Sequence, residues 1–270
     1  MVELRNKYQI GKRRFGIVNW IGARSLYYKE CSRFIAVWAQ TLMSPLVSSL
    51  LFLSVLNLAL GNERGEVMGF SFINFLAPGL IAMSFISQSF SHSVSSLIIS
   101  KMQGNIVDIL YAPLSALEVT LSVILAAVTR GLLIAIISII VFSFIVDIKF
   151  YNIFYIFIFG FFGSFILGAL GFITGLWAEK FDHTATITNF IVTPLTFLSG
   201  TFFTIDKLPV FFMQISEINP FFYMIDGFRY GFLGESDGSV MFGIIYLFCL
   251  SCFTWFIAFI LYKKGYKIKS

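Results

Sequence analysis

Four long stretches of this chain contain no Asp, Glu, Lys or Arg, and they constrain its fold more than any other feature. They are residues 34–62, 67–100, 150–178 and 238–262. Each exceeds the roughly 20 apolar residues that a helix needs to cross a bilayer. Their apolar residues run continuously instead of alternating, which favours helices over a membrane β-barrel. Charged residues make up only 12% of the chain, so the sequence predicts an all-α polytopic membrane protein.

Hydropathy predicts six transmembrane helices, at about 35–58, 68–91, 121–146, 152–177, 185–204 and 240–261. An even number of spans places both termini on one side. Fourteen Lys and Arg residues fall on that side and four on the other. Because cytoplasmic loops are enriched in Lys and Arg, both termini are predicted to be cytoplasmic. The expected organisation is a cytoplasmic segment over 1–33, a membrane domain over 34–265 and a tail over 266–270, with no cleavable signal peptide.

The basic N-terminal segment is predicted to form a helix over residues 17–33 that lies on the inner leaflet. Its apolar side would carry Ile17, Trp20, Ala23, Tyr27 and Cys31, and its polar side Lys29, Glu30 and Arg33. The alternative is a basic tail that only orients the chain.

A stripe of small residues marks the fourth span. Spaced by three or four, they fall on one helical face: Gly160, Ser164, Gly168, Gly171 and Gly175. Helices in lipid associate through close backbone approach, so this face is expected to pack against another helix.

Arg130 is the one ion inside a predicted span. Counted from an outer end near Val146, it lies about 24 Å deep, in the cytoplasmic third. It either contacts a substrate headgroup or a carboxylate, or it is an anchor that snorkels inward.

The polar connection 93–117 contains apolar residues at helical spacing, namely Ile98, Met102, Ile106 and Leu110. They predict one short cytoplasmic helix that runs past Gly104 and ends at Pro113. Its apolar face would need lipid or a protein partner.

Signals for chemistry within the chain are missing. There is no phosphate-binding G-x-x-x-x-G-K-[ST] loop, and His92 and His183 lie far apart without clustered carboxylates. Cys249 and Cys252 fall inside an apolar span, where we interpret them as packing residues and a redox or metal role as the alternative. We therefore expect no metal site, no cofactor and no nucleic-acid partner.

Four stretches in order resemble the type-2 ATP-binding-cassette (ABC-2) exporter permeases. They are FLAPGLIAMS at 75–84, GNIVDILYAPLS at 104–115, PLTFLSGTFFTIDKLP at 194–209 and NPFFYMIDGFRYGFLG at 219–234. The resemblance covers residues 20–265 and is strongest to small uncharacterised bacterial members. It implies an inner-membrane exporter subunit, a dimer of permeases in membrane lipid, and a separate ABC ATPase that binds ATP and Mg²⁺.

The resemblance also implies two functional segments. An external re-entrant hairpin, with helices at 208–216 and 221–232, would cap the outer mouth; its motif residues are Asn219, Pro220, Tyr223, Asp226, Phe228, Arg229 and Gly231. Asp226 and Arg229 are three apart and would pair, and Gly227 and Gly231 permit close packing. The contact with the ATPase is expected at Ile98, Met102, Gly104, Asn105, Ile106, Asp108 and Leu110.

Other functions remain open. The hairpin segment is alternatively an outer-surface loop without a gating role. An ion-coupled carrier would need ionisable residues within the spans, where only Arg130 is available. A membrane-embedded transferase or protease would need clustered His and carboxylates at one depth. The expected substrate is an amphiphilic, lipid-linked, glycan or drug-like molecule that moves outward.

Overall fold

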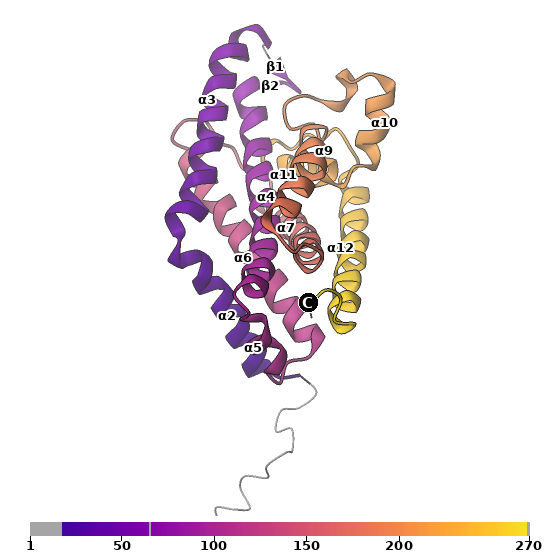
Figure 1. Cartoon of the computed structure of the whole chain (residues 1–270). Coiled ribbons are helices and arrows are strands. Elements are labelled where there is room, and N and C mark those ends of the chain that lie inside the picture. Colours follow the sequence, from indigo (N-terminus) through magenta and orange to yellow (C-terminus); the bar gives the residue numbers. More distant parts are fainter. Residues whose placement is uncertain (1–17, 65, 269–270) are drawn as a thin grey trace, which may run out of the picture.

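The computed structural model describes residues 18–64 and 66–268, which are almost entirely helical (Figure 1). The longest helices are α2 (Trp20–Ala36), α3 (Ser44–Arg64), α4 (Phe72–Met102), α6 (Ala116–Phe142), α7 (Ile153–Trp177) and α12 (Val240–Lys263). The shorter ones are η1 (Ala39–Met43), α5 (Ile106–Tyr111), α8 (Phe181–Ile187), η2 (Thr188–Val192), α9 (Thr193–Phe197), η3 (Ile205–Lys207), α10 (Val210–Ile218) and α11 (Pro220–Leu233). The prediction of an all-α polytopic fold is confirmed.

Within the described residues, five helices are long and apolar enough to cross a membrane: Ala39–Ala59, Phe72–Met102, Ala116–Phe142, Ile153–Trp177 and Val240–Lys263. The fifth predicted span, 185–204, is instead a shorter helical run over 181–197, made of α8, η2 and α9. It ends early because Gly200, at φ +73°, turns the chain out of the helix. At 1.5 Å per residue the run is about 25 Å long, somewhat less than the hydrocarbon core.

The bundle is centred on α4, α6 and α7, which pack on one another. Helices α2 and α3 form one edge of the molecule in Figure 1 and α12 the opposite edge. The small-residue stripe of α7 packs as predicted. A Cβ on Gly171 would lie 2.4 Å from the Phe90 carbonyl oxygen of α4, so only glycine permits this approach.

The N-terminal helix differs from the prediction in the face that it buries. It packs against α6 through Leu26, Cys31 and Phe34. Trp20, expected on the apolar side, is 76% exposed, whereas Glu30, expected on the polar side, is buried. Tertiary contacts override the amphipathic pattern because Glu30 finds polar partners on α4, described below. Ile17 lies outside the described residues.

A short β-hairpin with a two-residue turn joins α3 to α4, at the opposite end of the bundle from α5 (Figure 1). The antiparallel strands β1 (Glu66–Val67) and β2 (Phe70–Ser71) flank Met68 and Gly69. Both turn residues have positive φ, as this hairpin type requires.

Cys249 and Cys252 do not pack inside the protein as predicted. Both are free thiols that are exposed on the surface of α12. Among the described residues, no three His, Cys, Asp or Glu side chains gather as metal ligands.

Candidate functional site

The connection between α4 and α6 is split in two where the sequence predicted one helix. Helix α4 continues to Met102, and α5 begins at Ile106. Gly104 separates them at φ +76°, a left-handed conformation that breaks the helix. Helix α5 ends at Tyr111 because Ala112, which precedes Pro113, is extended at ψ 145°.

This split divides the residues predicted to contact an ATPase. Ile98 belongs to α4 and is fully buried. Ile106, the first residue of α5, is also buried. Five predicted residues are exposed: Met102, Gly104, Asn105, Asp108 and Leu110. The sequence analysis missed Val107 and Tyr111, which are 44% and 87% exposed. The spacing of Val107, Leu110 and Tyr111 on a helix that begins at Ile106 would have found them.

Clefts flank α5 on both sides. One, of about 520 Å³, lies between α5 and the C-terminal end of the described chain and is lined by Lys101, Val107, Tyr111 and Ile268 among others. The other, of about 400 Å³, lies between α5 and α2. Val107, Leu110 and Tyr111 form an exposed apolar ridge between these two clefts, which we call the α5 ridge. Another protein can bind a surface of this shape.

The start of α2 is tied to the turn between α5 and α6. The Asn19 backbone N–H donates to Glu118 Oε1 at 2.6 Å, and Asn19 Nδ2 donates to the Pro113 carbonyl at 3.1 Å. The other Glu118 oxygen accepts from the Ser115 N–H at 2.6 Å, which completes the capping box of α6. Asn19, just before α2, therefore bonds both the turn that follows α5 and the first turn of α6.

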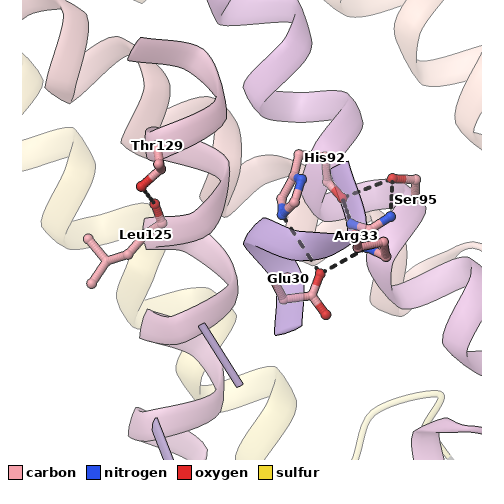
Figure 2. Close-up of polar contacts among 6 residues, drawn as sticks. All are labelled: Glu30, Arg33, His92, Ser95, Leu125 and Thr129. Carbon is pink, nitrogen blue, oxygen red and sulfur yellow. Dashed lines mark hydrogen bonds and ion pairs between the residues drawn. The ribbon is translucent and has the colours of Figure 1, made fainter. Parts of the chain in front are cut away.

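The other end of α2 is tied to α4 by buried ionic groups (Figure 2). Arg33 donates to Glu30 Oε2 at 3.1 Å, to the His92 carbonyl at 3.1 Å and to Ser95 Oγ at 3.2 Å. His92 Nε2 lies 3.7 Å from Glu30 Oε2. We call Glu30, Arg33, His92 and Ser95 the α2–α4 cluster. The sequence shows no clustered carboxylates around His92, but the structure brings one carboxylate, Glu30, next to it, although the two residues are 62 positions apart in sequence.

Arg130 does not snorkel toward the cytoplasm. It lies near the middle of α6, 7% exposed, and its guanidinium donates sideways to Gln88 Oε1 of α4. Among the described residues it forms no ion pair with a carboxylate. Next to it on α6, the Thr129 hydroxyl donates to the Leu125 carbonyl of its own helix (Figure 2). With its one hydrogen used there, Thr129 accepts the 2.7 Å bond from the Tyr27 hydroxyl of α2.

The segment predicted to be external forms two helices, α10 and α11, which meet at Asn219. Pro220 occupies the first position of α11, where its missing N–H has no helical partner to lose. Asn219 Oδ1 caps α11 through the Phe221 N–H, while its Nδ2 donates to the Leu195 carbonyl at 2.8 Å. Ser216 Oγ donates to the Leu198 carbonyl at 2.8 Å. The corner where α10 meets α11 thus binds carbonyls at the end of α9, where a helix leaves its last carbonyls without helical partners.

Asp226 and Arg229 do not form the predicted ion pair. Arg229 is almost fully buried, donates to the Gly200 carbonyl at 2.7 Å and lies 3.9 Å from the centre of the Phe75 ring. Asp226 accepts from the N–H groups of Asp237 and Gly238, both at 3.0 Å. Each charged group therefore binds a loop carbonyl or amide, so α11 is joined to the turns on either side of it.

The remaining motif residues press α11 against its neighbours. A Cβ on Gly231 would lie 2.4 Å from Ile156 Cγ1 of α7. The Phe228 ring packs 5.0 Å from Phe85 of α4, and Tyr223 packs 5.3 Å from Tyr246 of α12. Helix α11 thus packs against α4, α7 and α12, and it is not an isolated surface loop.

The loop after α11 carries a perturbed carboxyl group. Burial, and next the neighbouring Asp226 charge, raise the pKa of Asp237 from 3.8 to about 6. On the opposite side of the molecule, Lys267 bonds Glu179 at 3.0 Å and lowers the pKa of that exposed carboxyl.

Comparison with known proteins gives the family. A family model described as "ABC-2 type transporter" matches residues 22–233. The chain is 31% identical over 253 residues to the inner membrane transport permease YadH of Escherichia coli K12, covering 93% of this chain and 98% of that protein. It is 25% identical over 227 residues to Nodulation protein J of Rhizobium leguminosarum bv. viciae, covering 83% of this chain and 86% of that one. It is 24% identical over 247 residues to Nodulation protein J of Rhizobium meliloti, covering 91% and 93%.

The matched region includes the α5 ridge, the α2–α4 cluster, Arg130 and the external hairpin up to Leu233. Fold, hydropathy and similarity over nearly the whole length of a permease agree. The chain belongs to the ABC-2 type transporter family and is a multi-pass inner-membrane permease subunit of an ABC transporter.

Proposed function

We propose that this permease exports its substrate outward, driven by a separate ABC ATPase that binds the α5 ridge. ATP and Mg²⁺ would bind to that partner, and this chain would bind no cofactor. The observation that carries the proposal is the exposed apolar ridge of Val107, Leu110 and Tyr111, set between two clefts. Large apolar side chains exposed in a polar environment are typical of protein interfaces.

The hydrogen bonds around α5 support a route for mechanical coupling. A push on α5 would reach α6 and α2 through the short turn that follows α5, because Asn19 bonds Pro113 in that turn and Glu118 in the first turn of α6. The α2–α4 cluster would then carry the movement of α2 into α4. Helix α2 would move as a rigid element, because hydrogen bonds join its start to the turn before α6 and its other end to α4.

At the other end of the bundle, α10 and α11 would form the outer gate. Their side chains bind the carbonyls at the end of α9, so the fifth span and the gate would move together. Opening would require these bonds to break or exchange. Arg229, the largest fully buried side chain of the described residues, donates to the Gly200 carbonyl at this junction. A hairpin without a gating role would not need a buried cation there.

The transporter is proposed to contain two permeases and two ATPase subunits, with both termini of each permease in the cytoplasm. Helix α3 exposes apolar residues such as Val47, Leu51 and Val55, which a second copy or membrane lipid would cover. The substrate is proposed to be amphiphilic, lipid-linked, glycan or drug-like. Among similar proteins, the names describe a transport permease and a nodulation protein.

The test is to purify the permease together with its ATPase partner in lipid nanodiscs. We expect Tyr111→Asp and Val107→Asp to abolish co-purification and the stimulation of ATP hydrolysis by the permease. The matched control is Tyr266→Asp, which changes another exposed tyrosine on the same side of the protein. Normal co-purification of both α5 variants would refute the proposal.

A second candidate, ion-coupled transport, is favoured by one observation. Glu30 and His92 form the kind of buried ionisable pair that proton-coupled carriers use. Vesicle assays separate the two functions: export that needs ATP and its partner subunit, and persists without a proton gradient, excludes the carrier. Transport that needs only the gradient excludes the ATP-driven exporter.

A further inference from the structure

A groove with both polar and apolar lining opens between α3, α4 and α9, and none of the sites above uses it. Its volume is about 290 Å³. Its lining includes hydroxyl and amide groups beside aromatic rings: Ser48, Ser84, Ser87, Gln88, Phe52 and Phe197. Hydroxyl and amide groups of two apolar membrane helices, α3 and α4, thus gather on one groove, and polar side chains within membrane helices are candidates for functional paths.

The groove reaches the interior of the membrane. Gln88 lies about 21 Å along α4 from its cytoplasmic end at Met102 and about 24 Å from its outer end at Phe72. Arg130 stands behind Gln88 at the same depth and is about 21 Å from the start of α6. A ligand at Gln88 would therefore be removed from bulk water on both sides.

The charge near Gln88 is not balanced by the described residues. Arg33 and Arg130 bring two positive charges, and the one carboxylate of the α2–α4 cluster, Glu30, is bonded to Arg33. Arg130 Nε has no hydrogen-bond partner among the described residues. A buried cation without a counter-ion is costly in a membrane, so an anion from outside the chain would be stabilised here.

Gln88 lies between the Arg130 guanidinium and the groove. Its Oε1 accepts from Arg130, which leaves its amide NH₂ as a donor polarised by the guanidinium behind it. The serine hydroxyls beside it are further donors. Phe52 and Phe197 offer apolar surface next to these donors.

We propose that this groove binds the anionic headgroup of an amphiphile, with Gln88 as the donor and Arg130 as the charge behind it. The chemical class is a phosphate or carboxylate group, joined to an apolar chain that lies along Phe52 and Phe197. This inference rests on the proposed export function only in taking the groove as part of the substrate path.

The test measures equilibrium binding of ³²P-labelled dodecyl phosphate to the permease–ATPase complex in a neutral detergent, without nucleotide. We expect saturable binding to the wild-type complex. Gln88→Met and Arg130→Gln should each weaken it at least tenfold. The matched controls are Gln40→Met and Arg24→Gln, exposed positions outside the groove, which should bind as the wild type does.

A third variant keeps the proposal testable if removal of Arg130 prevents folding. Gln88→Glu places a carboxylate beside Arg130 and should take the place of the ligand. We expect it to melt at a higher temperature than the wild type without ligand and to bind dodecyl phosphate at least tenfold more weakly. Unchanged binding in Gln88→Met and Gln88→Glu would overturn the proposal.

Competition identifies the source of the anion. Displacement by inorganic phosphate as effectively as by unlabelled dodecyl phosphate would assign a soluble anion, and displacement by dodecyl phosphate alone a headgroup that enters from lipid. Both outcomes support the anion site. Because the assay contains no ATP, a failure of ATP-driven export would leave its result standing, and weak binding would leave the export function standing.

Discussion

Individual polar residues hold the external hairpin mainly by binding main-chain carbonyls. Asn219, Ser216 and Arg229 all donate to the segment where α9 ends, at residues 195–200. A helix end inside a membrane protein leaves carbonyls that cannot turn to water. These three side chains supply the missing donors, and Arg229 does so from a site that is almost fully buried.

We predict that Arg229→Met impairs export more than assembly. The methionine fills much of the same space but leaves the Gly200 carbonyl without its donor, which costs about 1–3 kcal/mol. Transport by the assembled complex should fall at least tenfold, while co-purification with the ATPase stays normal. Lys207→Met, an exposed cation of the same region, is the control. Wild-type transport by Arg229→Met would remove Arg229 from the gate.

The sequence identified Arg229 and Asp226 as special residues but not their partners. A spacing of three predicts a pair on an isolated helix, yet carbonyls and amides of adjacent turns lie closer in the folded chain. Likewise, nothing local links Glu30 to His92. Residue type and depth can be read from a sequence, whereas contacts across 30 or 60 residues depend on how the helices pack.

A pH effect is expected at Asp237. Its pKa is raised to about 6 by burial and by Asp226, so the folded loop binds a proton more tightly than the unfolded chain does. Its contribution to stability is fully present below about pH 4 and is lost as the pH rises through about 6. Arg229 acts in the opposite direction and Asp206 in the same one.

The measurement compares melting temperatures of Asp237→Asn and wild type at pH 4.5 and pH 7.5. The asparagine cannot ionise, so the variant should gain stability relative to wild type at the higher pH. Asp182→Asn, an exposed change on the other side of the membrane domain, should not show this trend. A difference between Asp237→Asn and wild type that is the same at both pH values would contradict the assignment.

At the scale of elements, α7 is the helix whose contacts the sequence predicted best. Its small residues permit α4 to approach until the Phe90 carbonyl lies where a side chain on Gly171 would begin. Gly160, on the same stripe, has the flexible end of Leu132 as its nearest neighbour, 3.2 Å from where a Cβ would lie. The stripe therefore mixes rigid contacts, as at Gly171, with more tolerant ones, as at Gly160.

This difference predicts unequal effects of the same substitution. Gly171→Ala meets main-chain atoms that cannot move alone, and overpacking of this kind costs about 1–3 kcal/mol. Gly160→Ala should lower the melting temperature in detergent far less, because the Leu132 side chain can rotate away. Equal melting temperatures for the two variants would show that α4 and α7 separate without cost.

Helices α2 and α5 were predicted less well, for two physical reasons. The amphipathic pattern of α2 placed Glu30 on the polar side, because a carboxylate is expected to be buried only where it has partners, and its partners on α4 cannot be read from the sequence. The apolar pattern over 98–112 ran through Gly104, whose helix-breaking conformation no periodicity can show. Once the break is placed, the exposed ridge of α5 follows from its own register.

For the whole molecule, the distribution of charge predicts the orientation that the proposed mechanism requires. The described cytoplasmic end would carry α2, α5 and the end of α12, with basic residues such as Lys29, Lys101 and Lys264. The β1–β2 turn and the hairpin would face outward. An ATPase can reach α5 only in this orientation, so topology and function stand together.

We therefore predict the labelling pattern of intact cells with a membrane-impermeant maleimide. In a background where Cys31, Cys249 and Cys252 are replaced by Ala, a cysteine at Gly69 should react from outside, because the space around that turn is open. A cysteine at Tyr111, the most exposed residue of α5, should react only after the cells are opened. The reverse pattern would place α5 outside, away from ATP, and would remove the physical basis for its coupling to an ATPase.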